Sequence, residues 1–214
     1  MTDVIKNERL IVIVRGVQKD QLIPLAESMY AGGVRLLELT YSANGAVSDE
    51  DTAARIGMLC THFGDRMHIG AGTVLTERQV ELTHNAGGKF IISPDSNPDV
   101  IKKTKALGMI SMPGALTPTE AQAAHRAGAD FVKLFPVSDL GPSYVKAVRA
   151  PLSHISFLAV GGVDLDNMKD YLAAGVCGFG IGSNIIDKKM LAEEDWEGIT
   201  ELARRYVSAA KGEV

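Results

Sequence analysis

The strongest constraint on the fold is a unit that recurs four times: a helix-like stretch, an Ala-Gly stop and then an apolar strand. The four strands are VRLLEL at 34–39, KFII at 89–92, ADFV at 129–132 and VCGFGI at 176–181. A glycine just past a helix end supplies the left-handed backbone conformation that closes the helix. The strand follows at once because loops from helix to strand are short in such units. The unit therefore predicts helices that alternate with parallel strands.

Four further apolar runs, at 10–14, 67–71, 109–112 and 155–160, bring the number of expected strands to eight. The intervening segments show helical spacing of apolar residues, as in Leu22, Leu25, Ala26 and Met29. No linker or shift in composition divides the chain. We therefore predict a single α/β domain over residues 1–214, a (β/α)8 TIM barrel. A doubly wound open sheet remains the alternative, because repeats alone do not prove that a sheet closes.

Composition narrows the classes of function. Of 214 residues, 46% are hydrophobic and 22% are charged, as in ordinary soluble proteins. The net charge of −4 does not fit a general nucleic-acid-binding protein, and no apolar run reaches the length of a membrane span. The N-terminal MTDVIKNERL lacks a secretory signal, and Cys60 and Cys177 have the isolated placement of free thiols in a reducing compartment. We expect a cytoplasmic protein without a nucleic-acid or membrane partner.

Lys133 interrupts the apolar run ADFVKLFP at 129–136, which otherwise has the pattern of a buried parallel strand. Lysine is almost never fully buried unless it is paired or used. Burial disfavours the ammonium form, so a buried lysine becomes a neutral amine that attacks carbonyl carbon, as in Schiff-base enzymes. The local pattern equally fits a strand-end lysine whose amine reaches water.

In a barrel of this kind the active site lies at the carboxyl ends of the strands. Two glycines, Gly161 and Gly162, follow the seventh expected strand, and Gly182 with Ser183 follows the eighth, entering the next helix. Backbone N–H groups exposed on the last two strands form the usual phosphate site of such barrels. The pair of motifs favours a phosphorylated substrate over simple turns.

Glu38 is a second charge inside an apolar strand. Burial raises the pKa of a carboxyl group, which suits proton transfer near neutral pH. The alternative is a structural ion pair with Arg15 or Lys133. Arg15 and Thr73 lie at the ends of their strands, where they could hold a substrate carboxylate. Thr73 fits equally well as the cap of the following helix.

The histidines give little support to a metal enzyme. His62, His84 and His125 fall in helical stretches, His154 precedes an expected strand and His68 lies early in another. Neither His-x-His nor HExxH occurs, whereas metal-dependent epimerases and aldolases need clustered ligands. We expect no metal site.

Taken together, these residues resemble the 2-keto-3-deoxy-6-phosphogluconate / 4-hydroxy-2-oxoglutarate aldolase family of class I aldolases. The resemblance extends from Leu10 to about Ala209. It rests on AGGVRLLELT at 31–40, GAGTVL at 70–75, KLFP at 133–136, VGG at 160–162 and GS at 182–183.

The resemblance implies that Lys133 forms a Schiff base with pyruvate or the keto substrate, while Glu38 moves protons through a water. It implies no metal or other cofactor, and a homotrimer. The remaining implied roles concern substrate binding. The pyruvate carboxylate would contact Thr73, and the imine would pack on Phe135. The pocket would be shaped by Pro94 and Pro113, and the phosphate would bind at Gly161, Gly162, Gly182 and Ser183.

One departure affects the expected substrate. Gluconate-type members carry an arginine four residues past the glutamate, where this chain has Ser42, and Arg15 with the stretch after KLFP looks closer to the phosphogalactonate branch. The expected reaction is cleavage of a 2-keto-3-deoxy-6-phospho sugar acid of either type to pyruvate and D-glyceraldehyde 3-phosphate, with 4-hydroxy-2-oxoglutarate as a further substrate. The alternatives are a non-catalytic sugar-phosphate-binding barrel and a metal-dependent epimerase or aldolase.

Overall fold

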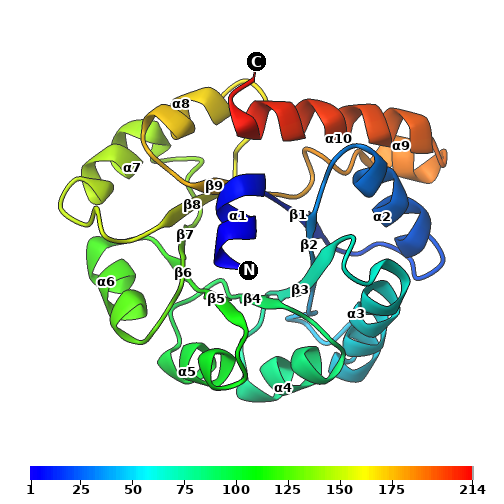
Figure 1. The fold of residues 1–214 in the computed structure, drawn as a ribbon, viewed down its shortest axis with the longest axis horizontal. Helices are drawn as coiled ribbons and strands as arrows, with labels where there is room; N and C mark the ends of the chain where they lie inside the picture. The colour runs from blue at the N-terminus through cyan, green and yellow to red at the C-terminus, as the bar shows by residue number, and fades with distance from the viewer. Residues whose placement is uncertain (214) are drawn as a thin grey trace.

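The chain forms a ring of parallel strands surrounded by helices, seen end-on in Figure 1. The computed structural model describes residues 1–213. The strands are β1 (Leu10–Val14), β2 (Leu36–Thr40), β3 (His68–Gly72), β4 (Phe90–Ile92), β5 (Ile110–Met112), β6 (Gly114–Ala115), β7 (Val132–Leu134), β8 (Phe157–Val160) and β9 (Gly178–Ile181).

The sheet closes at Pro113, which separates β5 from β6. Strand β5 pairs with β4, and β6 pairs with β7, so the two pieces act as one interrupted strand. Lys133 N donates to Pro113 O at 2.9 Å, and Phe131 N donates to Ser111 O at 3.3 Å, which joins β7 to both pieces. With β5 and β6 counted as one strand, residues 1–213 form a closed ring of eight strands, which confirms the predicted barrel and excludes the open sheet.

Helices α2 to α10 cover the outside of the ring, and α1 lies across one end of it (Figure 1); their bounds follow. They are α1 (Thr2–Glu8), α2 (Leu22–Ala31), α3 (Asp49–Phe63), α4 (Glu77–Asn85), α5 (Pro98–Ala106), α6 (Pro118–Arg126), α7 (Gly141–Arg149), α8 (Met168–Ala173), α9 (Lys188–Ala192) and α10 (Trp196–Lys211). Among the described residues, none of these helices is long and apolar enough to cross a membrane.

The glycines of the four repeated units end helices as predicted. Gly33, Gly87, Gly128 and Gly175 have φ values of 99°, 89°, 107° and 92°. A side chain would strain the backbone in this left-handed region, so glycine allows the short step from helix to strand.

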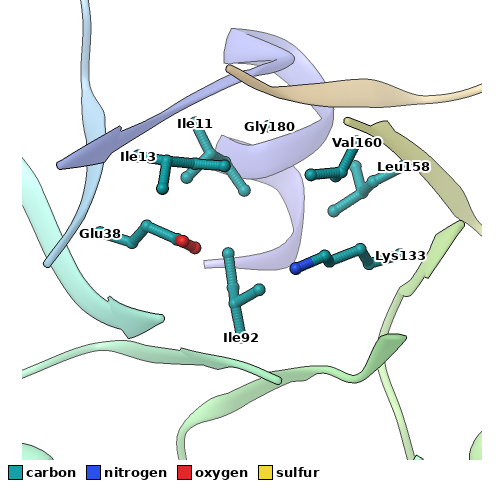
Figure 2. A pocket seen from close by; sticks show the side chains of 8 residues that line it. All are labelled: Ile11, Ile13, Glu38, Ile92, Lys133, Leu158, Val160 and Gly180. Atoms are coloured by element: carbon teal, nitrogen blue, oxygen red, sulfur yellow. The ribbon is translucent and has the colours of Figure 1, made fainter. Parts of the chain in front are cut away.

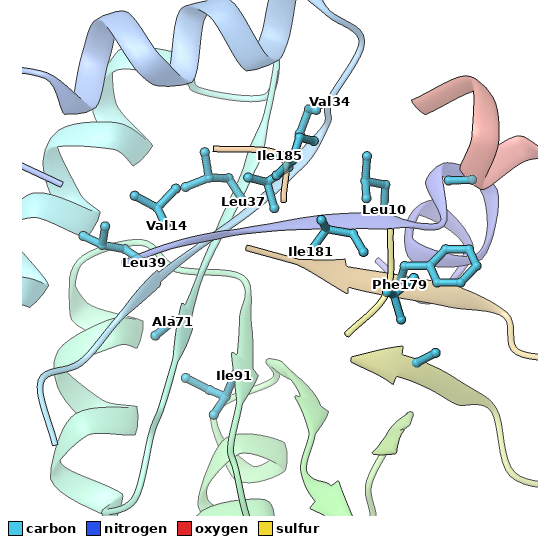
Figure 3. Packing of buried hydrophobic residues seen from close by; sticks show 14 of the residues in the cluster. Leu10, Val14, Val34, Leu37, Leu39, Ala71, Ile91, Phe179, Ile181 and Ile185 are labelled. Atoms are coloured by element: carbon cyan, nitrogen blue, oxygen red, sulfur yellow. The ribbon is translucent and has the colours of Figure 1, made fainter. Parts of the chain in front are cut away.

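Side chains on the strands alternate between two apolar layers. Leu10, Val12 and Val14 of β1 pack outward against the helices, whereas Ile11 and Ile13 face the barrel interior. Figure 3 shows part of the outer layer, with side chains of β1, β2 and β9 packed together. The inward positions are therefore few and enclosed, and any polar residue among them is desolvated.

Helix α1, which the repeated unit does not predict, lies across one end of the ring (Figure 1). Its Ile5 side chain is 1% exposed and packs with the inward-facing residues Leu36 and Phe90. A seven-residue helix with so few apolar side chains has little periodicity to detect. It closes the end of the barrel opposite the strand termini that carry polar residues.

We predict that Ile5→Ala lowers the free energy of unfolding by about 2–5 kcal/mol, because it leaves a cavity at the closed end of the barrel. Urea denaturation monitored by circular dichroism measures the change. Asn7→Ala, at an exposed position of the same helix, is the matched control and should change stability by less than about 0.5 kcal/mol. Equal stability of the two variants would show that α1 does not close the core.

Candidate active site

Lys133 and Glu38 face each other inside the barrel. Lys133 is the middle residue of β7 and Glu38 the middle residue of β2, and both occupy inward positions of their strands. Their exposed fractions are 7% and 2%. Figure 2 shows the amine and the carboxylate pointing toward one another from opposite walls. Barrel closure thus brings together two charges that lie far apart in the sequence.

A small cavity of about 10 Å³ lies between these two groups. This is about the minimum volume that holds one water molecule. Its walls are otherwise aliphatic or glycine, and the lining residues are Ile11, Ile13, Glu38, Ile92, Lys133, Leu158, Val160 and Gly180.

Burial controls the protonation of Glu38. It raises the pKa of this carboxyl group to about 7, while the nearby positive charges of Lys133 and Arg15 act in the opposite direction. Within the described residues, Oε2 of Glu38 is buried without a hydrogen-bond partner. A carboxyl group in this state can both accept and release a proton near neutral pH.

Burial also lowers the pKa of Lys133, opposed by the charge of Glu38 and assisted by that of Arg15. Among residues 1–213, no carboxylate lies within 4.0 Å of its amine, so the two interior charges do not form a close ion pair. The amine lies 4.4 Å from the ring centroid of Phe135. Lys133 therefore has the environment of a lysine with an enlarged neutral fraction.

Arg15 and Thr73 meet at the mouth of the barrel, where Arg15 Nη2 donates to Thr73 Oγ1 at 3.1 Å. Thr73 has a φ of 56°, a strained conformation for a β-branched residue. The prediction that Thr73 caps the next helix is wrong. Thr76 is the cap of α4 and accepts a hydrogen bond from Gln79 N, so the backbone turn leaves Thr73 facing Arg15.

A cleft of about 470 Å³ opens beside Arg15 and Thr73, over the ends of β1, β2 and β3. Ser42 lines this cleft but uses its hydroxyl within its own loop, donating to Asn44 Oδ1 and accepting from Ala46 N. Ser42 thus supplies no charge. Arg15 and Arg55 both line the cleft, and Arg55 forms an ion pair with Asp51.

The loops after β8 and β9 lie together. Gly161 and Gly162 have φ values of 86° and 79°, and Asn184 Nδ2 donates to Val163 O at 2.9 Å, which ties the two loops. Sequence patterns did not indicate Asn184, since a single polar residue after Gly-Ser carries no specific signal.

Ser183 does not enter a helix, contrary to the prediction. It lies in a turn in which Ile185 N and Ile186 N both donate to Gly182 O, and α9 begins only at Lys188, after its cap Asp187. Burial of Ile185 and Ile186 holds this turn against the core.

The two prolines that were predicted to shape the pocket lie at the ends of neighbouring strands. Pro94 follows β4, and Pro113 interrupts the adjacent strand. The two approach closely through Gly114, where a Cβ atom would lie only 2.3 Å from Pro94 O. Among residues 1–213, no group of three or more His, Cys, Asp or Glu side chains is arranged to hold a metal ion.

Comparison with known proteins identifies the family to which this barrel belongs. Residues 1–202 match the family of KDPG and KHG aldolases, the abbreviations standing for 2-keto-3-deoxy-6-phosphogluconate and 4-hydroxy-2-oxoglutarate. The chain belongs to this aldolase family. The protein is accordingly a lyase of the aldolase type.

Three relatives illustrate the similarity. The protein named "Probable 2-dehydro-3-deoxy-6-phosphogalactonate aldolase" from Rhizobium meliloti (strain 1021) is 38% identical over 185 residues, covering 86% of this chain and 84% of the relative. A solved native KDPGal structure has a TM-score of 0.82 at 32% identity, covering 94% of this chain and 96% of that one. A KDPG aldolase from Legionella pneumophila, with pyruvate captured as a covalent carbinolamine, has a TM-score of 0.84 at 27% identity, covering 95% and 96%.

We predict that Glu38→Gln gains stability relative to the unsubstituted protein as pH rises from about 4.5 to above 7. Glu38 has an ordinary pKa of 4.5 when unfolded and about 7 when folded, so the folded chain binds more protons in this window. Its unfolding free energy therefore falls as pH increases, by up to about 3 kcal/mol in total. Glutamine does not titrate.

Urea denaturation of both proteins at pH 4.5 and pH 8 measures this change. A stability difference that is the same at the two pH values would contradict it.

Proposed function

We propose that this chain, over residues 1–214, is a Schiff-base aldolase that cleaves a 2-keto-3-deoxy-6-phospho sugar acid to pyruvate and D-glyceraldehyde 3-phosphate. The observation that carries the proposal is the enclosed Lys133 amine opposite Glu38, which forms no ion pair with the residues that the structure describes. The Legionella pneumophila relative, in which pyruvate is held as a covalent carbinolamine, supports the same chemistry.

In the proposed mechanism, the neutral Lys133 amine attacks the keto carbon of the substrate. The new carbon–nitrogen bond gives a carbinolamine, which loses water to form a protonated imine. The imine accepts the electron pair released when the carbon–carbon bond breaks, producing the aldehyde and an enamine. Protonation of the enamine carbon and hydrolysis of the imine then release pyruvate and restore the lysine.

Glu38 would accept and return the protons in these steps. Its raised pKa suits both directions of transfer near neutral pH. The cavity between Glu38 and Lys133 is of the size of one water, which fits a proton path through a bridging water.

Binding of the substrate is assigned to the barrel mouth. Arg15 and Thr73, already joined by a hydrogen bond, would hold the carboxylate of pyruvate. Phe135 would pack on the imine, since its ring already lies against the amine, and Pro94 and Pro113 would form the adjacent wall. The tied loops bearing Gly161, Gly162, Gly182 and Ser183 would receive the phosphate.

We further propose that the protein assembles as a homotrimer in the cytoplasm. The family resemblance supports the trimer.

We predict that incubation with pyruvate and borohydride adds one reduced pyruvyl group, on Lys133, because borohydride traps an imine irreversibly. Intact-mass and peptide mass spectrometry locate the adduct. Lys133→Ala should lose the adduct and essentially all cleavage activity while remaining folded, whereas Lys146→Ala, at an exposed position of α7, should keep both. An unmodified Lys133 in the folded protein would favour the non-catalytic binding barrel instead.

We predict a higher kcat/KM for the 6-phosphogalactonate epimer than for the 6-phosphogluconate epimer. Ser42 stands in place of the gluconate-type arginine, and the Rhizobium meliloti relative supports the galactonate branch. Pocket contacts discriminate such epimers by about 1–3 kcal/mol each. A coupled assay of pyruvate release, run with both epimers and with 4-hydroxy-2-oxoglutarate, measures the order of preference. A higher kcat/KM for the gluconate epimer would overturn the prediction.

A metal-chelating agent tests the metal-dependent alternative. Unchanged aldolase activity in its presence would set that alternative aside.

A further inference from the structure

We propose that Gly72 is a positioning residue for the acid–base step, because its missing side chain leaves the space in which the Glu38 carboxylate lies. This inference rests on the proposed role of Glu38 in proton transfer. Gly72 is the last residue of β3, the strand that pairs with β2.

The space above Gly72 is filled by the glutamate. A Cβ atom at Gly72 would lie 2.2 Å from Glu38 Oε1 and 2.6 Å from Glu38 Cδ, and the next atom is Thr40 Cγ2 at 3.1 Å. The two distances to Glu38 are far below van der Waals contact, so alanine and Glu38 cannot occupy these positions together.

The backbone does not require glycine at this position. Gly72 lies in a strand and is absent from the positive-φ glycines of the described chain. Glycine weakens a strand interior and often marks a close approach of another group. The close approach here is that of a carboxylate, so the glycine serves the position of Glu38 and not a turn.

Packing against its neighbours limits where the Glu38 carboxylate can lie. Its Oε2 atom has no hydrogen-bond partner among residues 1–213, and its neighbours across the cavity include Ile13 and Ile92. A carboxylate displaced from Gly72 would take a new position relative to the Lys133 amine. Catalysis is sensitive to such shifts, since a displacement of about 1 Å can lower a rate by roughly 100-fold.

Gly70 provides a matched contrast on the same face of β3. A Cβ atom there would lie 2.3 Å from the Phe90 ring and meets no part of Glu38 among its nearest atoms. Gly70 thus makes room for the apolar core, whereas Gly72 makes room for the proposed acid–base group.

The test is a pair of double-variant cycles: Gly72→Ala and Gly70→Ala, each alone and combined with Glu38→Ala. We expect Gly72→Ala to lower kcat by roughly 10- to 100-fold, with a smaller change in KM. Removing the glutamate side chain removes the two closest contacts and leaves the one with Thr40, so Gly72→Ala should lower Tm more in the presence of Glu38 than in the Glu38→Ala background. Gly70→Ala should lower Tm by the same amount in both backgrounds.

The outcomes separate the two proposals. Full activity of Glu38→Ala would overturn the proposed role of Glu38 itself. Loss of activity in Glu38→Ala, with Gly72→Ala within twofold of the unsubstituted protein, would overturn the role of Gly72 alone. An equal drop in Tm in both backgrounds would make Gly72 a packing residue and overturn its positioning role. If Gly72→Ala fails to fold, recovery of a folded protein in the double variant supports the proposal, and failure of both overturns it.

Discussion

The parallel sheet closes on itself, and this closure sets which side chains meet inside the barrel. In a closed barrel every second side chain of a strand faces the interior, so residues on distant strands come to share one enclosed space. The hydrogen bonds across the Pro113 interruption complete the ring and set the height of Lys133 on its wall. The register of β2 against β1 places Glu38 beside Ile13 on the opposite wall. The candidate site is therefore a consequence of closure.

The interior charges are held in surroundings that do not stabilise them. A buried ionised group without hydrogen bonds is unfavourable, and the attraction between Lys133 and Glu38 only partly offsets their burial, since burial dominates both pKa shifts. The aliphatic layer between strands and helices provides the compensating stability. The chain thus tolerates a locally unfavourable arrangement whose raised and lowered pKa values suit acid–base and imine chemistry near neutral pH.

Inward-facing glycines leave space that larger side chains fill inside the barrel. At inward positions of β3 and β9, the space left by Gly70, Gly72 and Gly180 is filled by Phe90, Glu38 and Val160 respectively. Gly70 thus makes room for core packing, and Gly72 makes room for the side chain that carries the proposed chemistry. Left-handed glycines outside the barrel have a different task, which is to end helices in the short repeated units.

Local patterns were enough to predict the alternation of helices and strands and to single out Lys133, Glu38 and Arg15, because periodicity and a charge in an apolar run can be recognised without the fold. They did not determine closure, helix α1, the turn at Ser183 or the true cap of α4. Those features depend on the register of distant strands and on which groups compete for each hydrogen bond. Only the tertiary structure placed Glu38 above Gly72 and opposite Lys133, because strand pairing and barrel closure, and no local pattern, bring these three positions together.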